Sequence, residues 1–285
     1  MSSLDLHTTK KDYAFLIATL ALLLAIGFAV LSLAGAAVII VVPAVAAVLV
    51  LGVVLEVYRR LSEDARRFEE RHDEQQLQNY RQIEALFSLF FTIKPALPLP
   101  EMRAWAGSPD LLKKIAEVVL MDKPALVVEA SSGVSTLVIA YCLKQLGRGT
   151  VVSLEHDAKY AAASERLVAF HGLQDIATIV HAPLKEVAID SQKWLWYDSD
   201  LLQMSAPIDL LVVDGPPDSI QPLARYPAVP LLKQQLRTGA KVILDDSDRR
   251  DETEIVARWV KEFGLSAESF AMEKGACILS VREAP

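Results

Sequence analysis

The sequence predicts an α/β fold built on a mostly parallel sheet, and this domain is preceded by a segment that inserts into a membrane. Two observations carry the prediction. Buried-strand patterns alternate with helical patterns from residue 109 to residue 263, an order typical of parallel sheets. An uncharged run extends from Ala14 to Leu55. The length of 285 residues fits one or two domains, and the formal net charge of −7 gives no electrostatic footprint for nucleic acid.

The stretch from Leu126 to Thr136, LVVEASSGVST, is the centre of the predicted sheet. An apolar strand ends in the carboxylate Glu129, small residues including Gly133 follow, and a helical pattern begins after them. Small residues let a ligand lie against the backbone, and a helix N-terminus offers free N–H groups. The next strand ends in Glu155, where a carboxylate can accept hydrogen bonds from two ribose hydroxyls. These features predict a nucleoside-containing cofactor, against the alternative of a plain strand–helix turn without a ligand.

Two cofactor classes compete for this turn. A dinucleotide site uses G-x-G-x-x-G, but this chain has Ser131, Gly133 and Thr136 at those positions. The stretch is instead similar to motif I of the class I S-adenosylmethionine-dependent methyltransferases, and most closely to a subgroup with an E-x-G-S-G-x-S-T signature. Ser131 replaces the first glycine of that signature. The resemblance implies that S-adenosylmethionine is bound by Glu129, Ser131, Ser132, Gly133, Ser135, Glu155, His156, His181 and Asp214.

Further motifs resemble the same subgroup over residues 105 to 281. Trp105, Ser108 and Pro109 precede motif I, the run VDGPP contains Asp214 after the fourth strand, and Arg225-Tyr226-Pro227-Ala228-Val229-Pro230 follows. The chain closes with two strands, near 269–273 and 276–282, joined by a tight turn. The resemblance implies a Rossmann-like methyltransferase fold with a mostly parallel seven-stranded sheet and a C-terminal antiparallel hairpin.

Three aspartates follow neighbouring strands of the predicted sheet. Asp214 ends the fourth strand, and Asp245 and Asp246 end the fifth. Ligands bind at the carboxyl ends of such strands, so we expect Asp214 and Asp245 to be catalytic. The set also resembles the divalent-metal site of catechol-type O-methyltransferases, in which Mg²⁺ would hold an acceptor hydroxyl. Asp246 stands where that family has Asn. The alternative is that these aspartates cap helices or pair with nearby arginines: Arg225, Arg249 and Arg250.

The uncharged run is about twice the length that one helix needs to cross a bilayer. We therefore predict a transmembrane hairpin that turns near residues 33–36, with Pro43 in the second helix. Lysines precede the first span and arginines follow the second, which places both termini and the catalytic domain in the cytoplasm. A signal peptide and a buried hairpin of a soluble protein are the rival interpretations.

The predicted domains are residues 1–57 for the N-terminus and hairpin, 58–93 for a helical stalk, and 94–285 for the methyltransferase domain. A heptad-like stripe, formed by Val54, Tyr58, Leu61, Ala65 and Phe68, allows a homodimer through the stalk, although a solvated stalk explains it as well. The aromatic residues between Ser191 and Leu202 form either a packing lid or part of a substrate wall. Cys142 and Cys277 lie in apolar patterns and are expected to be buried thiols.

The sequence as a whole predicts a membrane-anchored S-adenosylmethionine-dependent methyltransferase. The carboxylate cluster favours O-methylation, with a small molecule or a lipid- or sugar-linked group as the acceptor. The anchor favours an acceptor that is linked to a lipid or lies near the membrane. Two other interpretations stay open. One is a non-catalytic membrane scaffold, favoured by Ser131; the other is a nucleotide-dependent oxidoreductase, disfavoured by the missing glycines.

Overall fold

The computed structural model describes residues 10–32, 38–103, 106–202 and 206–281. The chain forms two compact units, residues 1–75 and residues 76–285. The predicted turn at 33–36 and the motif residue Trp105 lie outside the described residues. The second unit begins well before the predicted domain start at residue 94. It does so because the last turns of the long helix bury Ala85, Leu89 and Ile93 in the core of the domain.

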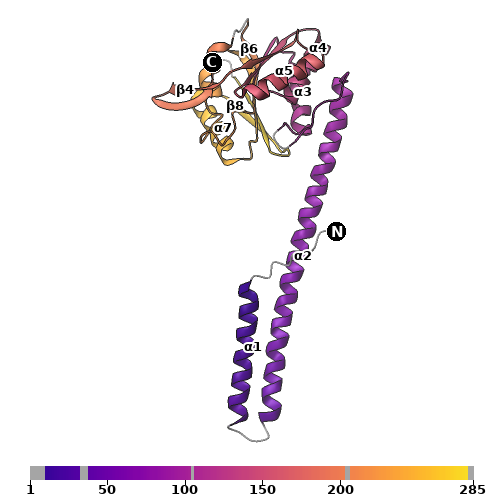
Figure 1. Ribbon diagram of the computed structural model, residues 1–285, viewed down its shortest axis with the longest axis vertical. Coiled ribbons are helices and arrows are strands. Elements are labelled where there is room, and N and C mark those ends of the chain that lie inside the picture. The colour runs from indigo at the N-terminus through magenta and orange to yellow at the C-terminus, as the bar shows by residue number, and fades with distance from the viewer. Residues whose placement is uncertain (1–9, 33–37, 104–105, 203–205, 282–285) are drawn as a thin grey trace. The chain divides into compact units, whose positions relative to one another are not determined.

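Two helices make up the N-terminal unit, α1 (Lys10–Leu31) and the first part of α2 (Val38–Ile93) (Figure 1). The two helices contact each other at Gly27 and Val42, where a Cβ built on Gly27 would lie 3.5 Å from Val42 Cγ1. Pro43 lies inside α2, as expected. Among the described residues, the helix Ile40–Ile93 is the one that is long and apolar enough to cross a membrane, and Ile17–Val30 is a shorter apolar helix.

A seven-stranded sheet with the order β3-β2-β1-β6-β7-β9-β8 forms the second unit. Its strands are β1 (Leu126–Ala130), β2 (Thr150–Glu155), β3 (Ala177–His181), β6 (Ile208–Val213), β7 (Leu236–Asp245), β8 (Ser266–Phe270) and β9 (Ala276–Ser280). The first five in the order are parallel, and β9 runs antiparallel to both β7 and β8. The predicted mostly parallel sheet with its C-terminal hairpin is therefore confirmed.

Helices cover both faces of this sheet. They are α3 (Pro109–Asp122), α4 (Val134–Leu146), α5 (Ala158–Phe170), α6 (Ala228–Leu232) and α7 (Arg250–Phe263). Successive side chains of a strand point to opposite faces, so Val127 joins the core beneath α3 and α4, and Val128 joins the core beneath α6 and α7. Both cysteines are buried and free, as expected. Because both faces of these strands are buried in apolar cores, polar side chains gather at the carboxyl ends of the strands.

A two-stranded hairpin, β4 (Leu184–Ile189) and β5 (Gln192–Tyr197), connects β3 to β6. It was not predicted, because aromatic residues at 194, 196 and 197 break the strict alternation of a strand. The short 3-10 helix Ser199–Leu201 follows it. Trp194, Trp196 and Tyr197 are all buried in the core that also contains α6 and α7. The aromatic cluster therefore packs the domain, which was one of its two interpretations.

Candidate active site

The turn between β1 and α4 is held in place by a buried carboxylate. Glu129 is completely buried, and its Oε2 accepts hydrogen bonds from Thr136 Oγ1 and Ser153 Oγ, each at 2.6 Å. Thr136 Oγ1 in turn accepts the backbone N–H of Gly133 at 3.1 Å. Burial raises the pKa of Glu129, and hydrogen bonds from Ser135, Ser153 and Thr136 oppose that rise. The first turn of α4 is thereby fixed to two neighbouring strands.

The backbone of this turn has glycine-type geometry at two positions. Gly133 has a φ of 145°, and Ser131 has a φ of 151°. Ser131 is the residue that replaces the first glycine of the signature, and its hydroxyl is buried without a hydrogen-bond partner. A Cβ built on Gly133 would meet no heavy atom within 4 Å, so open space lies beside the turn. The turn has room for a ligand. Its backbone is strained at Ser131, where the residue has a side chain in a conformation that favours glycine.

Glu155 ends β2 next to this turn and is tied to it. Ser132 Oγ donates to Glu155 Oε2 at 3.1 Å and lies 2.8 Å from Ser164 Oγ of α5. The other oxygen of Glu155 accepts the backbone N–H of Asp157 at 3.0 Å. The imidazole of His156 lies close by, with Nδ1 3.1 Å from Glu155 Oε1. The structure thus brings the turn, Glu155 and His156 together.

His181 is also adjacent in the sheet, since the Cα register pairs Glu155 with His181. Its side chain is exposed at the end of β3. The structure therefore places His181 at the rim rather than in the buried cluster.

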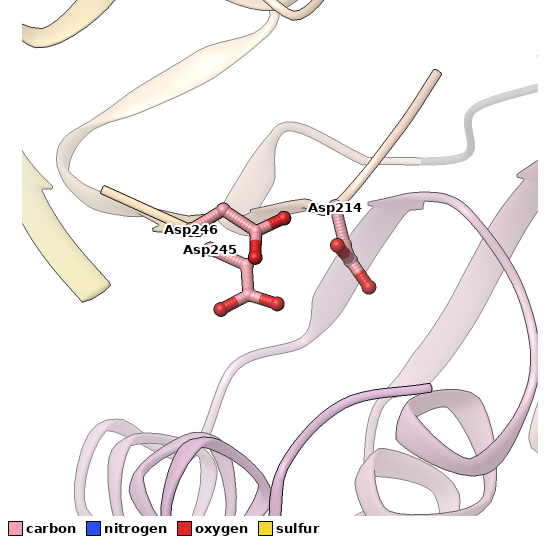
Figure 2. Close-up of side chains that lie close together, drawn as sticks. All are labelled: Asp214, Asp245 and Asp246. Atoms are coloured by element: carbon pink, nitrogen blue, oxygen red, sulfur yellow. The ribbon is translucent and has the colours of Figure 1, made fainter. Parts of the chain in front are cut away.

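Three aspartates gather at the ends of β6 and β7 (Figure 2). One carboxylate oxygen from each of Asp214, Asp245 and Asp246 lies within 4.8 Å of the others. Asp245 and Asp246 are 3% and 2% exposed. Asp246 has a φ of 59°, so the chain leaves the strand in a left-handed turn and directs two consecutive side chains to the same place. Adjacent parallel strands bring these residues together, as the sequence order suggests.

A buried arginine accompanies the aspartates. Arg225 is 4% exposed, and its Nη2 donates to Asp246 Oδ2 at 2.8 Å and to Asp214 Oδ1 at 3.2 Å. Its Nη1 donates to the backbone carbonyl of Asp245 at 2.9 Å. Sequence reasoning noted Arg225 only within a motif and as a possible ion-pair partner. It missed the residue as the centre of the cluster, because nothing in the local pattern shows which strand ends an arginine in a loop will reach.

The electrostatics of the cluster separate the two expected catalytic carboxylates. Burial raises the pKa of Asp214 to about 6, against the lowering effect of Arg225. Burial and the charges of Asp214 and Asp246 raise the pKa of Asp245 to about 8. At neutral pH, Asp214 is the carboxylate that can take a proton, and Asp245 already carries one.

The residues fit S-adenosylmethionine better than they fit a divalent ion. For the cofactor, the open turn at Gly133, the unpartnered oxygen Glu129 Oε1 and the carboxylate at Glu155 provide room and acceptors. For a metal ion, two of the three aspartates already accept hydrogen bonds from a guanidinium, and Asp246 lies 3.1 Å from Arg249 as well. Three free carboxylates would suit Mg²⁺, but here two of the three are already paired with cations.

Tyr197 of the hairpin lies beside Gly215 and His156, and sequence reasoning named it only as part of the aromatic cluster. Tyr197 is 1% exposed, and its ring meets that of His156 edge-on at 6.0 Å between centroids. A Cβ built on Gly215 would lie 2.2 Å from the hydroxyl oxygen of Tyr197. Burial, followed by the charges of Glu155 and Asp214, raises the pKa of Tyr197 well above its ordinary value. The phenol therefore stays neutral.

Comparisons with known proteins agree with this arrangement. Residues 130–247 match a family model described as a methyltransferase domain. No curated protein matches the chain. The structure of the Podospora anserina methyltransferase PaMTH1 with SAH bound is similar, with 14% identity, a TM-score of 0.51, and coverage of 70% of this chain and 88% of that chain.

Two further solved structures are O-methyltransferases. One, from Bacillus cereus and in complex with SAH, has 17% identity and a TM-score of 0.47, and covers 70% of this chain and 91% of that one. The other, TomG from Streptomyces achromogenes in complex with SAM, has 15% identity and a TM-score of 0.48, and covers 69% and 96%. The match over residues 130–247 indicates a methyltransferase domain. The similarity to PaMTH1 shows that the two chains share a fold, and that enzyme was solved with SAH bound.

Proposed function

We propose that this protein is a membrane-anchored O-methyltransferase whose acceptor is a small molecule or a group linked to a lipid or a sugar. The observation that carries the proposal is the line of acidic side chains at the carboxyl ends of adjacent strands: Glu129 in β1, Glu155 in β2, Asp214 after β6 and Asp245 in β7. In an open α/β sheet this edge, at the point where the strand order reverses, is where ligands bind.

The first two carboxylates belong to the cofactor half of the proposed site. Glu155 would accept the two ribose hydroxyls, and the turn from Ser131 to Ser135 would hold the methionine part. His156 would lie beside the nucleoside, and His181 would contact it from the rim. When bound, S-adenosylmethionine supplies an electrophilic methyl group on a sulfonium. Glu129 acts through the turn, because its hydrogen bonds to Thr136 and Ser153 fix the backbone that the cofactor would touch.

Asp214 belongs to the acceptor half of the proposed site. Its pKa of about 6 makes it a carboxylate at neutral pH, so it can accept the proton of an acceptor hydroxyl. Asp214 would take the proton of the acceptor hydroxyl as its oxygen bonds to the methyl group of the cofactor, and the thioether of SAH would be the leaving group. Asp245, with a pKa of about 8, would be a hydrogen-bond donor to the acceptor at the same pH. Below pH 6, loss of the Asp214 carboxylate should lower the rate.

Membrane attachment rests on the exposed apolar surface of the N-terminal unit. Helix α2 is long enough to cross a bilayer, and the apolar window that qualifies it is unburied. Exposed side chains such as Phe15, at 73%, and Phe28, at 79%, extend the apolar surface over α1. We infer two spans, with both termini and the catalytic domain in the cytoplasm, because Arg59 and Arg60 follow the second span. A homodimer through the stalk is a further proposal that rests on the stripe of Val54 to Phe68.

The experiment that tests the proposed function is calorimetric titration of SAM, SAH and NAD into the full-length protein in detergent. Micromolar binding of SAM and SAH is expected, without binding of NAD. Glu155→Gln should weaken SAH binding by about tenfold or more, because a hydrogen bond to a charged acceptor is lost. Glu186→Gln, on the exposed face of β4 where Glu186 pairs with Lys193, is the matched control. Absence of SAH binding would favour the scaffold, and binding of NAD would favour the oxidoreductase.

A further inference from the structure

We propose that Arg225 stands in place of a divalent cation at the aspartate cluster, so that methyl transfer by this enzyme requires no bound metal. The inference rests on the proposed function and assigns the chemistry of its acceptor half. Its basis is a single side chain, because the guanidinium of Arg225 contacts all three aspartates. It reaches the side chains of Asp214 and Asp246 at 3.2 and 2.8 Å, and the backbone carbonyl of Asp245 at 2.9 Å.

Charge balance is the first argument. Asp246 Oδ2 accepts from Arg225 and lies 3.1 Å from Arg249, and Asp246 Oδ1 lies 3.9 Å from Lys274. Glu252 lies 3.7 Å from Arg225 Nε. The carboxylates of Asp214 and Asp246 are therefore matched by cations that belong to the chain itself. A divalent ion added among them would meet repulsion from a guanidinium bonded to two of its would-be ligands.

The rigidity of Arg225 is the second argument, because a flexible arginine could swing aside for a metal. The loop that carries Arg225 is fixed on both sides. Leu223 N donates to Asp251 Oδ2 at 2.8 Å, and Tyr226 Oη donates to Glu262 Oε2 at 2.6 Å, so both neighbours are bonded to α7. Tyr226 also packs against Trp194, with ring centroids 4.9 Å apart. The planar guanidinium is thus held by its neighbours in a buried position.

The consequence is a division of labour within the cluster. Arg225 supplies the positive charge that a metal would supply, and its hydrogen bond holds the carboxylate of Asp214 in position. Arg225 is a positioning residue, because it acts through Asp214 rather than on the acceptor. The acceptor proton then goes to a carboxylate, and no step needs a hydroxyl bound to a metal.

The test uses the electron paramagnetic resonance signal of free Mn²⁺, which disappears when the ion binds. Full-length protein in detergent, stripped with EDTA, is titrated with Mn²⁺ to about 1 mM, where weak carboxylate sites fill. The wild type is expected to leave the signal unchanged. Arg225→Met should bind Mn²⁺ within this range, at least about tenfold more tightly than the limit of about 1 mM that applies to the wild type. The reason is that two carboxylates lose their cation. Arg237→Met, which removes the exposed pair of Arg237 with Asp209, is the matched control and should behave as wild type.

Saturable Mn²⁺ binding by the wild type that Asp214→Asn abolishes would overturn the proposal, and it does so even if Arg225→Met fails to fold. Isothermal titration of SAH into the same samples, with EDTA and with Mg²⁺, separates the two proposals. Loss of SAH binding overturns the proposed function and leaves the Mn²⁺ result intact. Equal SAH affinity in EDTA and in Mg²⁺ is the expected result for an enzyme in which Arg225 replaces the ion. Tighter SAH binding in Mg²⁺, lost in Asp214→Asn, would overturn the replacement.

Discussion

Arg225 Nη2 donates a hydrogen bond to Asp246 Oδ2 at 2.8 Å, and this bond joins a loop after β6 to the turn that ends β7. Both partners are buried, with 4% and 2% of their surfaces exposed. Removal of one member of such a pair leaves the other as an unpaired buried charge, a cost that exceeds the gain from the pair itself. A substitution of either residue in this pair therefore tests the acceptor half of the proposed site only if the variant is shown to fold.

Replacement of Ser131 by glycine should stabilise the protein. Ser131 has a φ of 151° and a buried hydroxyl without a partner, so glycine removes backbone strain and an unsatisfied polar group at once. We expect a gain of about 1 kcal/mol in the free energy of unfolding. Thermal unfolding of the full-length protein measures it. Gly133→Ala is the opposite change at a position with φ 145° and free space, and it should destabilise. A lower melting temperature for Ser131→Gly than for the wild type would contradict the inference that the backbone is strained at this residue.

Thr136→Val should loosen the cofactor turn. Valine keeps the shape of threonine but loses the bonds that the hydroxyl makes to Glu129 and to the backbone N–H of Gly133. Because Glu129 is buried, the expected cost is about 1–3 kcal/mol in unfolding free energy, together with weaker SAH binding. Chemical denaturation and calorimetry measure the two effects. Thr178→Val on the exposed face of β3 is the control, and an equal effect there would argue against a role for the Glu129 network.

The stability of the protein should fall through Asp245 as the pH rises from 3.8 to about 8. Burial raises its pKa in the folded state to about 8 from the ordinary value of 3.8, so the folded state holds the proton more tightly than the unfolded chain does. The stabilising contribution of this proton is complete below pH 3.8 and is lost as the pH rises through 8. Asp245→Asn should remove that dependence, with a gain on the order of 2 kcal/mol at pH 9 and little at pH 5. The control is Asp175→Asn at an exposed position. Parallel pH curves for wild type and Asp245→Asn would refute the assignment.

Gly215→Ala should destabilise the domain, and removal of the Tyr197 hydroxyl should restore part of the lost stability. The added Cβ would lie 2.2 Å from Tyr197 Oη, and Tyr197 is too deeply buried to move away. We expect a loss of about 1–3 kcal/mol, typical of overpacking. Tyr197→Phe removes the colliding oxygen, so the double variant should recover part of that loss. A double-mutant cycle from denaturation curves measures the coupling, and simple additivity would show that the clash is relieved by another route.

The centre of the sheet was predictable from sequence because β1, β2, β6 and β7 are largely apolar runs with an acidic residue at or next to their ends. The order of elements identified the parallel part, and the turn at Lys274-Gly275 identified the C-terminal hairpin. The start of the compact unit was not predictable, since Leu89 and Ile93 continue a helical pattern without a break at the point where they begin to pack on the domain. The β4–β5 hairpin was missed because its aromatic residues obscured the strand period.

The candidate site was predictable to the extent that strand ends determine it. Glu155, Asp214 and Asp245 follow from the rule that parallel strands meet at one edge. The role of Arg225 was not predictable, because it depends on the path of a loop and on burial, and neither has a local sequence signal. The position of Tyr197 beside Gly215 was not predictable either, because the sequence pattern did not reveal the hairpin that carries it.

The contact between Tyr197 and Gly215 has a consequence for how such an enzyme can diversify. A hairpin that projects from a sheet is usually free to change length and composition, and enzymes acquire new acceptors by exchanging such segments. Here the hydroxyl of Tyr197 in the hairpin packs against Gly215 just after β6, and this contact leaves no room for a side chain at residue 215. A transplanted hairpin would have to bring a matching partner with it. New acceptor preferences in a lineage with this contact would arise more readily in the rim around His181 than in the hairpin.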